Sequence, residues 1–535
     1  MDWLNETWEA FLGFWVYDPA RPMLFNSEGF LFSFLACLSV YLLIYKNTWL
    51  RVSWLTLYSL FFYYKSGGMY VFLLLFSILV NYLLALQLDK APTDKLRKRW
   101  LIAAVTLNLG ALAWFKYSYF FLSTAEWLFR TDMPHPDIWL PIGISFYTFQ
   151  VISYIADIHR RQMPPITNLL DFVFYVSFFP HSVAGPIMRA KEFAPQIRQT
   201  IQLSSEDLGR GLLLICAGLF KKAVISDYIS SNFVDRVFET PALFSGFENL
   251  MAVYGYALQI YCDFSGYSDM AIGLGLLMGY RLPLNFRTPY QSASIQEFWR
   301  RWHISLSSWL RDYLYIALGG NRRGRFFTYL NLLITMLLGG LWHGGAWRFV
   351  LWGALHGVAL VMDRMMRDIK EAIAQRYVRF LDSLDRWEVK RDKLGDPKPN
   401  EWITRLQWIT QGWLALILSV LVHMGGVFFT FHFVCFCWIF FRVESFDLAG
   451  EMLYQILRNF HGELAWKIIA DFRPVFLMML LGYFLHFLPE DLGRWVQQRF
   501  NRLPVPAKAV IVALFIWFTL LAGSAGEQPF IYYQF

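Results

Sequence analysis

The stretch that decides the fold is Asn331-Leu332-Leu333-Ile334-Thr335-Met336-Leu337-Leu338-Gly339-Gly340-Leu341-Trp342-His343-Gly344-Gly345. A second apolar run, Phe349–Met362, follows almost at once. Two apolar runs joined by a short turn predict a helical hairpin inside a membrane. An ionisable side chain at bilayer depth is energetically costly, so His343 at the tip of this hairpin is a candidate functional residue. The structural alternative is a buried histidine that only hydrogen-bonds to a helix carbonyl.

The composition agrees with a membrane protein. The chain has 535 residues, of which 56% are hydrophobic, 19% aromatic and 16% charged, whereas soluble domains carry about 25% charged residues. We therefore expect an all-α integral membrane protein with roughly 11 to 13 spans. The net charge of +8 is small for this length, which indicates a positive-inside bias and excludes nucleic acid as the expected partner. The scattered cysteines lack the spacing of metal ligands, so we expect no metal site.

The candidate spans vary in length around the roughly 20 residues that a perpendicular span needs, which indicates tilted, broken or re-entrant helices around a cavity. They are Phe30–Tyr45, Trp54–Tyr64, Met69–Leu88, Trp100–Leu122, Leu140–Ile158, Leu208–Val224, Leu250–Tyr280, Phe327–Leu341, Phe349–Met362, Trp413–Phe441, Val475–Phe487 and Ala509–Leu521. We divide the chain into an amphipathic N-terminal segment (1–28), a catalytic core (29–362), a charged cytoplasmic insertion and linker (363–408), a C-terminal helical bundle (409–522) and a C-terminal tail (523–535).

Basic residues orient the hairpin. Arginines at 322, 323 and 325 precede its first run, and Arg364, Arg367 and Lys370 follow its second, so both ends are expected in the cytoplasm. At helical rise, His343 then lies about 27 Å from Arg325, close to the opposite leaflet. The basic loop 494–508 places the start of the last span in the cytoplasm and the C-terminus in the periplasm. We expect a multi-pass protein of the bacterial inner membrane.

A cationic and aromatic cluster lies upstream of the hairpin. Its candidate binding residues are Arg300, Arg301, Trp302, Arg311 and Arg322. Arginines and indoles can bind the phosphates and the adenine of coenzyme A. An amphipathic helix on the lipid surface explains the same composition equally well. The cluster would also fit an acidic carrier protein.

Other polar residues lie in or beside apolar stretches. His303 follows the cationic cluster directly, and Asp263, Ser265 and Asp269 interrupt the long apolar span at Leu250–Tyr280. We expect the latter three, together with Trp342, to line an internal tunnel. Asp263 and Asp269 can also pair with a histidine or an arginine, or cap a broken helix.

Several motifs in a fixed order resemble the membrane-bound O-acyltransferase family, in particular its bacterial alginate O-acetyltransferase branch. The strongest is Glu297-Phe298-Trp299-Arg300-Arg301-Trp302-His303-Ile304-Ser305-Leu306-Ser307. The others are Leu140–Gln150, Phe178–Arg189, Tyr261–Asp269, Leu282–Phe286, Leu318–Arg322 and Trp342–Gly344. The resemblance covers most of the chain, and the joint presence of the motifs makes it specific.

This resemblance implies a fold, a reaction and partners. The fold is a ring of tilted helices around a thinned centre, with a tunnel that joins a cytoplasmic donor to a periplasmic acceptor. His343 corresponds to the catalytic histidine and His303 to the second signature position. The donor is acetyl-CoA and the acceptor an extracellular or cell-wall polysaccharide. A periplasmic hydrolase-fold acetyltransferase partner is implied, resembling those of alginate acetylation (AlgJ or AlgX) or of teichoic-acid D-alanylation (DltD).

The C-terminus ends in Phe530-Ile531-Tyr532-Tyr533-Gln534-Phe535. It resembles the ending of the alginate branch and of a small peptide of the D-alanylation system, in which a tyrosine is proposed to carry the acyl group. By this analogy Tyr532 is a candidate acyl carrier. An aromatic anchor at the membrane interface is the structural alternative.

Three other functions fit the same residues. D-alanyl or another acyl group could be transferred from a carrier protein. A transporter or flippase for an acylated precursor could use the histidines to relay protons. A scaffold could dock the periplasmic transferase without doing chemistry. Turnover of acetyl-CoA separates the first two from the acetyltransferase, and tolerance of substitutions at His303 and His343 identifies the scaffold.

Overall fold

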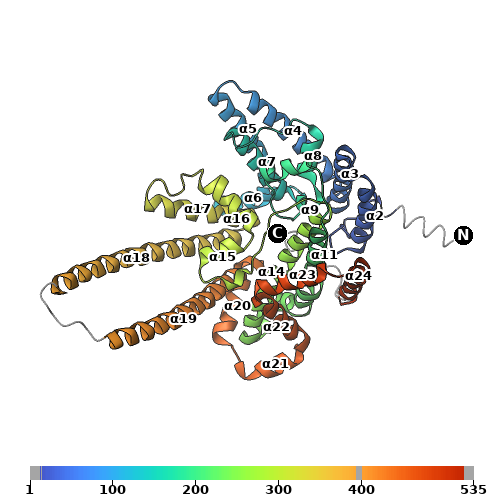
Figure 1. Cartoon of the computed structure of the whole chain (residues 1–535). Coiled ribbons are helices and arrows are strands. Elements are labelled where there is room, and N and C mark those ends of the chain that lie inside the picture. The colour runs from blue at the N-terminus through green and yellow to red at the C-terminus, as the bar shows by residue number, and fades with distance from the viewer. Residues whose placement is uncertain (1–12, 14, 393–400, 523–529, 531–535) are drawn as a thin grey trace.

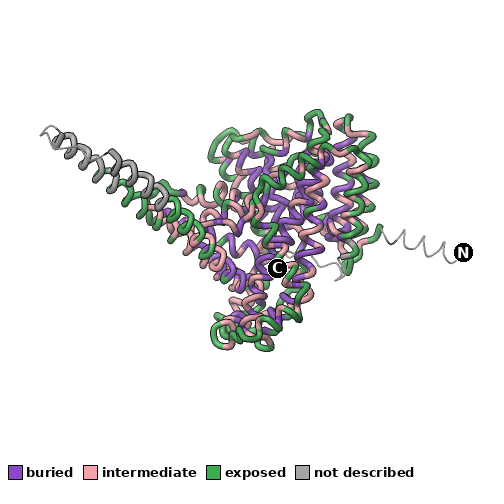
Figure 2. The backbone as a smooth tube through the Cα atoms, turned by 60° about the horizontal axis from the view of Figure 1, so that its bottom comes forward, coloured by how far each residue is buried: buried purple, intermediate pink, exposed green. Residues whose placement is uncertain are grey.

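The computed structural model describes residues 13, 15–392, 401–522 and 530. Within these ranges the chain forms helices joined by turns and loops, with no strand, as the composition predicts (Figure 1). The body of the molecule is compactly folded around buried helices, and two long helical arms leave it on one side (Figure 1). Buried residues are concentrated in the body, whereas those parts of the arms whose burial is described are mostly exposed (Figure 2).

The central element is α14 (Gly246–Leu277), a helix of 32 residues whose C-terminal two thirds are almost entirely buried. Ser245 and Glu248 form a capping box at its first turn, which satisfies the backbone donors there and fixes where the helix begins. Its neighbour is α11 (Ser205–Leu219), which is capped by the hydroxyl of Ser204.

Glycines bring α11 and α14 into backbone contact. A Cβ built at Gly211 would lie 2.9 Å from the carbonyl oxygen of Gly273, and one at Gly218 would lie 2.4 Å from that of Gly266. Small residues at such positions are the usual means of joining helices in a membrane, where apolar surface alone gives little preference for protein over lipid. The pair therefore forms a closely packed frame for the site.

The hairpin predicted around His343 is present. It consists of α17 (Arg325–His343) and α18 (Trp347–Asp392). A Cβ at Gly340 would lie 2.3 Å from the carbonyl oxygen of Phe349, and one at Gly353 would lie 2.4 Å from that of Met336. These two glycines set the distance between the helices, so the hairpin is closely packed next to its tip.

The N-terminal half supplies one flank of the body (Figure 1). Its helices are α2 (Glu28–Ile44), α3 (Thr48–Gly67), α4 (Tyr70–Lys90), α5 (Asp94–Leu112), α6 (Ser118–Phe129), α7 (Ile144–His159), α8 (Leu169–Ser177), α9 (Phe179–Ser182) and α10 (Ala190–Ile197). Two short helices, α15 (Ile295–Arg301) and α16 (Ile304–Trp309), connect α14 to the hairpin.

Several helices are interrupted by turns of a π-helix. These are η1 (Ala113–Tyr117), η2 (Phe220–Ser226), η3 (Ser230–Val234) and η6 (Leu310–Tyr315), and the short helices α12 (Asp227–Ile229) and α13 (Asp235–Glu239) lie among them. The π-helical turn is rare and often occurs at functional sites. Two of these turns, η1 and η6, adjoin cavities described below.

The C-terminal helices pack onto the core. They are α19 (Glu401–Arg442), α20 (Phe446–Arg458), α21 (Ala465–Asp471), α22 (Arg473–Phe487), α23 (Glu490–Asn501) and α24 (Val505–Ala522). α20 and α22 lie against α14, and α23 and α24 lie against α11. The expected separate bundle at 409–522 is therefore continuous with the core. The expected boundaries at 362 and 408 fall inside α18 and α19, which cross them without a break.

Five helical segments among the described residues are long and apolar enough to cross a membrane: Tyr70–Lys90, Asp94–Phe129, Arg325–His343, Trp347–Arg376 and Leu416–Arg442. A sixth arises if the segments Gly462–Asp471 and Arg473–Phe487, bent by 95°, form one span. The protein is thus a multi-pass membrane protein. Full-length apolar helices are fewer than the predicted spans because many apolar runs form short or broken helices inside the body.

Candidate active site

His343 is the last residue of α17 and is 2% exposed. Its imidazole lies edge-on to the rings of Trp352 from α18 and Phe441 from α19, with centroid separations of 5.0 and 5.3 Å. The neighbouring Trp342 lies at 5.0 Å. Three aromatic rings thus hold the imidazole in place and bury it. Burial of an ionisable side chain is the property for which the sequence made His343 a candidate.

His303 lies between α15 and α16 and is fully buried. Its backbone has φ 42° and ψ 57°, in the left-handed region. A non-glycine residue in this region is uncommon, and such backbone strain occurs preferentially at functional sites. The ring lies edge-on to Phe264 of α14, with centroids 4.6 Å apart, so the central helix positions the second histidine.

Asn285 holds the ring of His303 by a polar network. Its Oδ1 lies 3.1 Å from Nδ1 of His303 and accepts hydrogen bonds from the backbone N–H and the hydroxyl of Ser305 at 3.2 and 2.9 Å. Its Nδ2 donates to the hydroxyl of Ser268 at 3.1 Å, which fixes the orientation of the amide. Because Oδ1 can only accept, the proton of a neutral His303 sits on Nδ1, and Nε2 is the basic nitrogen.

Trp342 joins the two histidines. Its ring centroid lies 6.0 Å from that of His303 and 5.0 Å from that of His343. Phe149 of α7 stacks on the same indole at 5.5 Å. Residues predicted to act together but 40 positions apart in the sequence therefore meet around one buried ring.

A cationic cavity of about 450 Å³ lies beside the first turns of α17. Arg300, Arg311, Arg364 and Arg367 contribute to its lining. Apolar side chains of α17 and α18, including Leu332, Met336 and Leu360, complete the wall. We call this space the donor-side cavity. Four guanidinium groups over an apolar channel suit a ligand with several phosphates and a flexible apolar arm.

A second basic cavity of about 520 Å³ lies on the other side of η6 and is lined by Arg160, Lys191 and Arg322. Asp312 lies at its edge, 2.7 Å from both Arg189 and Arg311. Burial acts to raise the pKa of the Asp312 carboxyl, but the hydrogen bonds from the two arginines outweigh it and lower the pKa. Arg322, predicted to bind coenzyme A, lines this second cavity and does not line the donor-side cavity.

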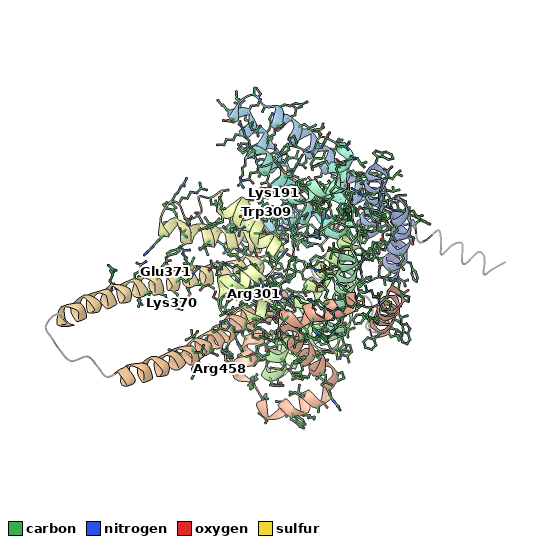
Figure 3. All side chains as sticks on the ribbon, in the orientation of Figure 1. Lys191, Arg301, Trp309, Lys370, Glu371 and Arg458 are labelled. Carbon is green, nitrogen blue, oxygen red and sulfur yellow. The ribbon has the colours of Figure 1, made fainter. Side chains whose placement is uncertain are left out.

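Besides Arg322, two more of the predicted coenzyme-binding residues lie away from the donor-side cavity. Arg301 donates to Glu297 at 2.7 Å and faces a different cavity, near the root of the arms (Figure 3). Trp302 is fully buried; it stacks on Phe298 at 5.6 Å and contacts Trp438 at 5.0 Å. Its indole is enclosed by aromatic rings, so it has no face left for adenine.

The polar residues of α14 lie in ion pairs. Asp263 lies 2.7 Å from Lys222, and Asp269 lies 2.6 Å from Lys221. Ser265, between them, is buried. None of the three lines the cavities described here, whereas Trp342 lines a small one. The structural role of Asp263 and Asp269 is to compensate the buried Lys222 and the partly buried Lys221, since an unpaired buried charge would be strongly destabilising.

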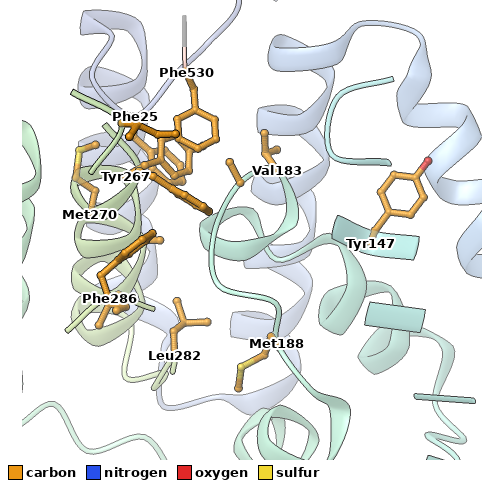
Figure 4. Close-up of a cluster of buried hydrophobic side chains, with 14 of the residues drawn as sticks. Phe25, Tyr147, Val183, Met188, Tyr267, Met270, Leu282, Phe286 and Phe530 are labelled. Carbon is orange, nitrogen blue, oxygen red and sulfur yellow. The ribbon is translucent and has the colours of Figure 1, made fainter. Parts of the chain in front are cut away.

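Phe530 of the C-terminal segment is packed inside the body. This residue is 1% exposed and packs on Tyr267 and Phe264 of α14, at centroid distances of 4.9 and 5.4 Å. Phe25 stacks on Tyr267 at 4.4 Å, so Phe25 and Phe530 both pack on one residue of the central helix (Figure 4). Tyr532 lies outside the described residues.

Sequence reasoning missed three residues of this site. Asn285 stands in a quoted motif, but nothing in the sequence shows that it bonds to His303. Arg364 and Arg367 were interpreted only as signs of topology, although their spacing of three places them on one helix face. No cluster of potential metal ligands is found in the described part of the chain.

Fold and site together define a class: a multi-pass helical membrane protein that encloses two histidines behind a cationic cavity. Residues 101–376 match the membrane-bound O-acyltransferase family, and the chain belongs to it. The chain is 34% identical to a peptidoglycan O-acetyltransferase of Helicobacter pylori, over 96% of this chain and 98% of that protein. It is thus an O-acyltransferase. The O-acetyl activity in the names of its relatives assigns it to the acetyltransferases of the family.

Two further relatives cover less of the chain. It is 42% identical to a probable alginate O-acetylase AlgI of Pseudomonas aeruginosa, over 64% of this chain and 66% of that protein. It is 26% identical to a teichoic acid D-alanyltransferase of Bacillus subtilis, over 57% of this chain and 69% of that protein. Because the chain is an enzyme, the transporter and scaffold interpretations are set aside.

Proposed function

We propose that the protein transfers acetyl groups from cytoplasmic acetyl-CoA, through the inner membrane, to an extracellular or cell-wall polysaccharide. The observation that carries the proposal is the donor-side cavity, whose four arginines lie toward the N-terminal end of α17, the end that its flanking basic residues assign to the cytoplasm. The same helix ends at His343. The names of two relatives, a peptidoglycan O-acetyltransferase and a probable alginate O-acetylase, support a glycan acceptor.

The cavity matches the chemistry of the donor. Arg300 and Arg311 come from α15 and η6, and Arg364 and Arg367 come from α18, so charges from two sides face one ligand. Arginine binds phosphate oxygens by paired hydrogen bonds. From this rim the apolar wall continues along α17 through Leu332 to Met336, which suits the pantetheine arm and points the thioester toward the histidines.

The transfer itself needs one base and one leaving group. His343 accepts the proton of the acceptor hydroxyl as its oxygen attacks the thioester carbonyl carbon. The new C–O bond forms, the C–S bond breaks, and coenzyme A leaves as a thiolate that takes up the proton. His303, held by Asn285 with Nε2 basic, orients the thioester or stabilises the charge that develops on its oxygen. No metal is part of this proposal.

The acceptor side involves the C-terminal tail. Phe530 is anchored on Phe264, whose ring also contacts His303. We propose that Tyr532 carries the acetyl group to a periplasmic hydrolase-fold partner, with the C-terminus on the periplasmic side. Tyr532→Phe removes only the hydroxyl; retained glycan acetylation would exclude the carrier role but not the enzyme.

The central test uses purified protein and cells. His343→Ala should abolish acetylation of the surface glycan, measured by mass spectrometry of released esters, and leave membrane insertion unchanged. Purified wild-type protein in lipid nanodiscs should bind acetyl-CoA and release coenzyme A, and the variant should bind without release. Glycan acetylation by His343→Ala at the wild-type level would overturn the proposal.

A second candidate is transfer of D-alanine or another acyl group from an acidic carrier protein. The second basic cavity, with Arg160, Lys191 and Arg322, favours it, as does the D-alanyltransferase relative. A carrier protein would engage both basic cavities, whereas coenzyme A needs only the first. Release of coenzyme A from acetyl-CoA by the purified protein excludes this candidate, and release from an acylated carrier protein alone supports it.

A further inference from the structure

A lysine that the proposed chemistry does not use lies beside the catalytic hairpin. Lys116 is in η1, a π-helical turn inside the apolar segment Asp94–Phe129. A charge in such a segment is costly and marks a functional candidate. No carboxylate is within ion-pair distance of its Nζ among the described residues, although other lysines of the body have such partners. The ammonium group is satisfied in a different way.

Its partners are the last carbonyls of α17. Nζ donates to the carbonyl oxygens of Trp342 and His343 at 2.8 and 3.0 Å. The last four carbonyls of a helix have no partner within the helix, and a cation at this end is favoured by the helix dipole. Lys116 therefore closes α17 at the residue whose side chain is the proposed base.

The backbone of the same π turn supports the residues that follow. A Cβ built at Gly345 would lie 2.9 Å from the carbonyl oxygen of Lys116. The turn after His343 is therefore packed directly against η1. Together these contacts hold both sides of His343, one through the ammonium group and one through the backbone.

A small cavity of about 70 Å³ opens at this place. Its polar lining is Lys116 and Ser145, whose hydroxyl lies 3.5 Å from Nζ. Trp342 and the segment 140–144 form the rest of the wall. Gly143, with φ 73°, brings this segment close to Ser182. A Cβ built at Gly143 would lie 2.7 Å from the carbonyl oxygen of Ser182. The donor-side cavity reaches only Met336 on the same helix, so the two cavities lie toward opposite ends of α17.

We infer that Lys116 is a positioning residue of the transfer step and that the small cavity admits the hydroxyl group of the acceptor. The inference rests on the proposed function. Lys116 fixes the carbonyl end of α17 and thereby the imidazole of His343, and with Ser145 it forms the polar wall along which a sugar or tyrosine hydroxyl approaches. A misplaced base costs rate without weakening the binding of the donor.

The test compares Lys116→Met, Lys116→Arg and Ser118→Ala. Ser118 begins α6 directly after the π turn, and its hydroxyl donates to the carbonyl oxygen of Trp114 within that turn, so its variant controls for disturbance of the π turn. Lys116→Met should lower the rate of glycan acetylation about ten- to a hundredfold, while the Kd for acetyl-CoA changes by less than about twofold. Lys116→Arg should recover most of the rate, because it keeps the cation, and Ser118→Ala should match the wild type.

The outcomes are separable. A wild-type rate in Lys116→Met overturns the inference, and so does a loss of acetyl-CoA binding in proportion to the loss of rate, which indicates general damage. If Lys116→Met does not fold, Ser145→Ala provides the second reading: it removes a polar wall group without touching α17, and an unchanged rate overturns the role of the cavity. If His343→Ala retains activity, the proposed function fails first.

Discussion

The two ends of α17 differ in width and in charge. At its first turns the donor-side cavity has about 450 Å³ and four arginines, whereas at its last residue the small cavity has about 70 Å³, one lysine and one serine. Two of these arginines have carboxylate partners, Arg311 with Asp312 at 2.7 Å and Arg364 with Asp368 at 3.2 Å, whereas the lysine is bound to carbonyl oxygens. One end is therefore built to bind a large anion, and the other to hold one side chain in place. Substitutions at the two ends should change different kinetic constants.

The largest effect is expected at the wide end. Arg300→Gln combined with Arg311→Gln should raise the KM for acetyl-CoA about a hundredfold, because each charge-assisted hydrogen bond to a phosphate contributes roughly 1.5–3 kcal/mol. The kcat should change by less than about threefold. Steady-state release of coenzyme A measures both constants. Arg323→Gln, in the turn before α17 and outside the cavity lining, is the control. A loss confined to kcat would show that the two ends do not act separately.

The next effect concerns the imidazole ring of His303 and the amide that holds it. Asn285→Leu removes the acceptor that fixes the tautomer of His303 and should lower kcat about tenfold or more. Its control is Asn108→Leu, which breaks a buried amide pair with Asn81 far from the histidines. Both variants should lose thermal stability, measured by scanning fluorimetry in nanodiscs. Equal losses of kcat would show that stability, and not the tautomer, limits the rate.

A smaller effect is expected from the close packing of α17 against α18. A Cβ at Gly353 meets the carbonyl oxygen of Met336 at 2.4 Å, so Gly353→Ala should force α17 and α18 apart and destabilise the protein by about 1–3 kcal/mol. Gly425→Ala, on α19 with open space around it, should not. Thermal unfolding measures the difference. An unchanged melting temperature in Gly353→Ala would mean that the helices separate at no cost.

The smallest effect is expected at the partition between the basic cavities. The folded pKa of Asp312 is lowered, so its stabilising contribution is present above the usual carboxyl value of about 3.9 and is lost as the pH falls through the lowered value. Asp312→Asn should lower stability by about 1 kcal/mol or less, equally from pH 5 to 8. Below about pH 4 the wild type should lose this advantage. A difference that varies between pH 5 and 8 would contradict the assignment.

The sequence predicts the hairpin well because its signals are local. Arginines at 322, 323 and 325 mark the start of the first apolar run, and His343 closely follows its end. The helix α17 accordingly spans Arg325–His343. The predicted span Trp413–Phe441 proves to be part of one helix, α19. The motif order identifies the family and, with it, the two histidines that meet around Trp342.

The sequence does not predict contacts that depend on packing between distant segments. Lys116 is 226 residues from Trp342, and inside an apolar run it has no spacing that marks it. Trp302 has the composition of a nucleotide-stacking residue but is enclosed by aromatic rings from α15 and α19. Similarly, Asp263 and Asp269 look like tunnel residues until Lys222 and Lys221 are placed beside them.

The unbroken helix α18 has a consequence for the evolution of the chain. It begins four residues after His343 and continues to Asp392, while the match to the family ends at residue 376, inside the arm. Each residue inserted beyond that point would rotate the far end of the arm by about 100° and lengthen it by about 1.5 Å. The near end would not move. Insertions can thus change the length of the arm and the direction in which its far end points, without moving His343 near its base.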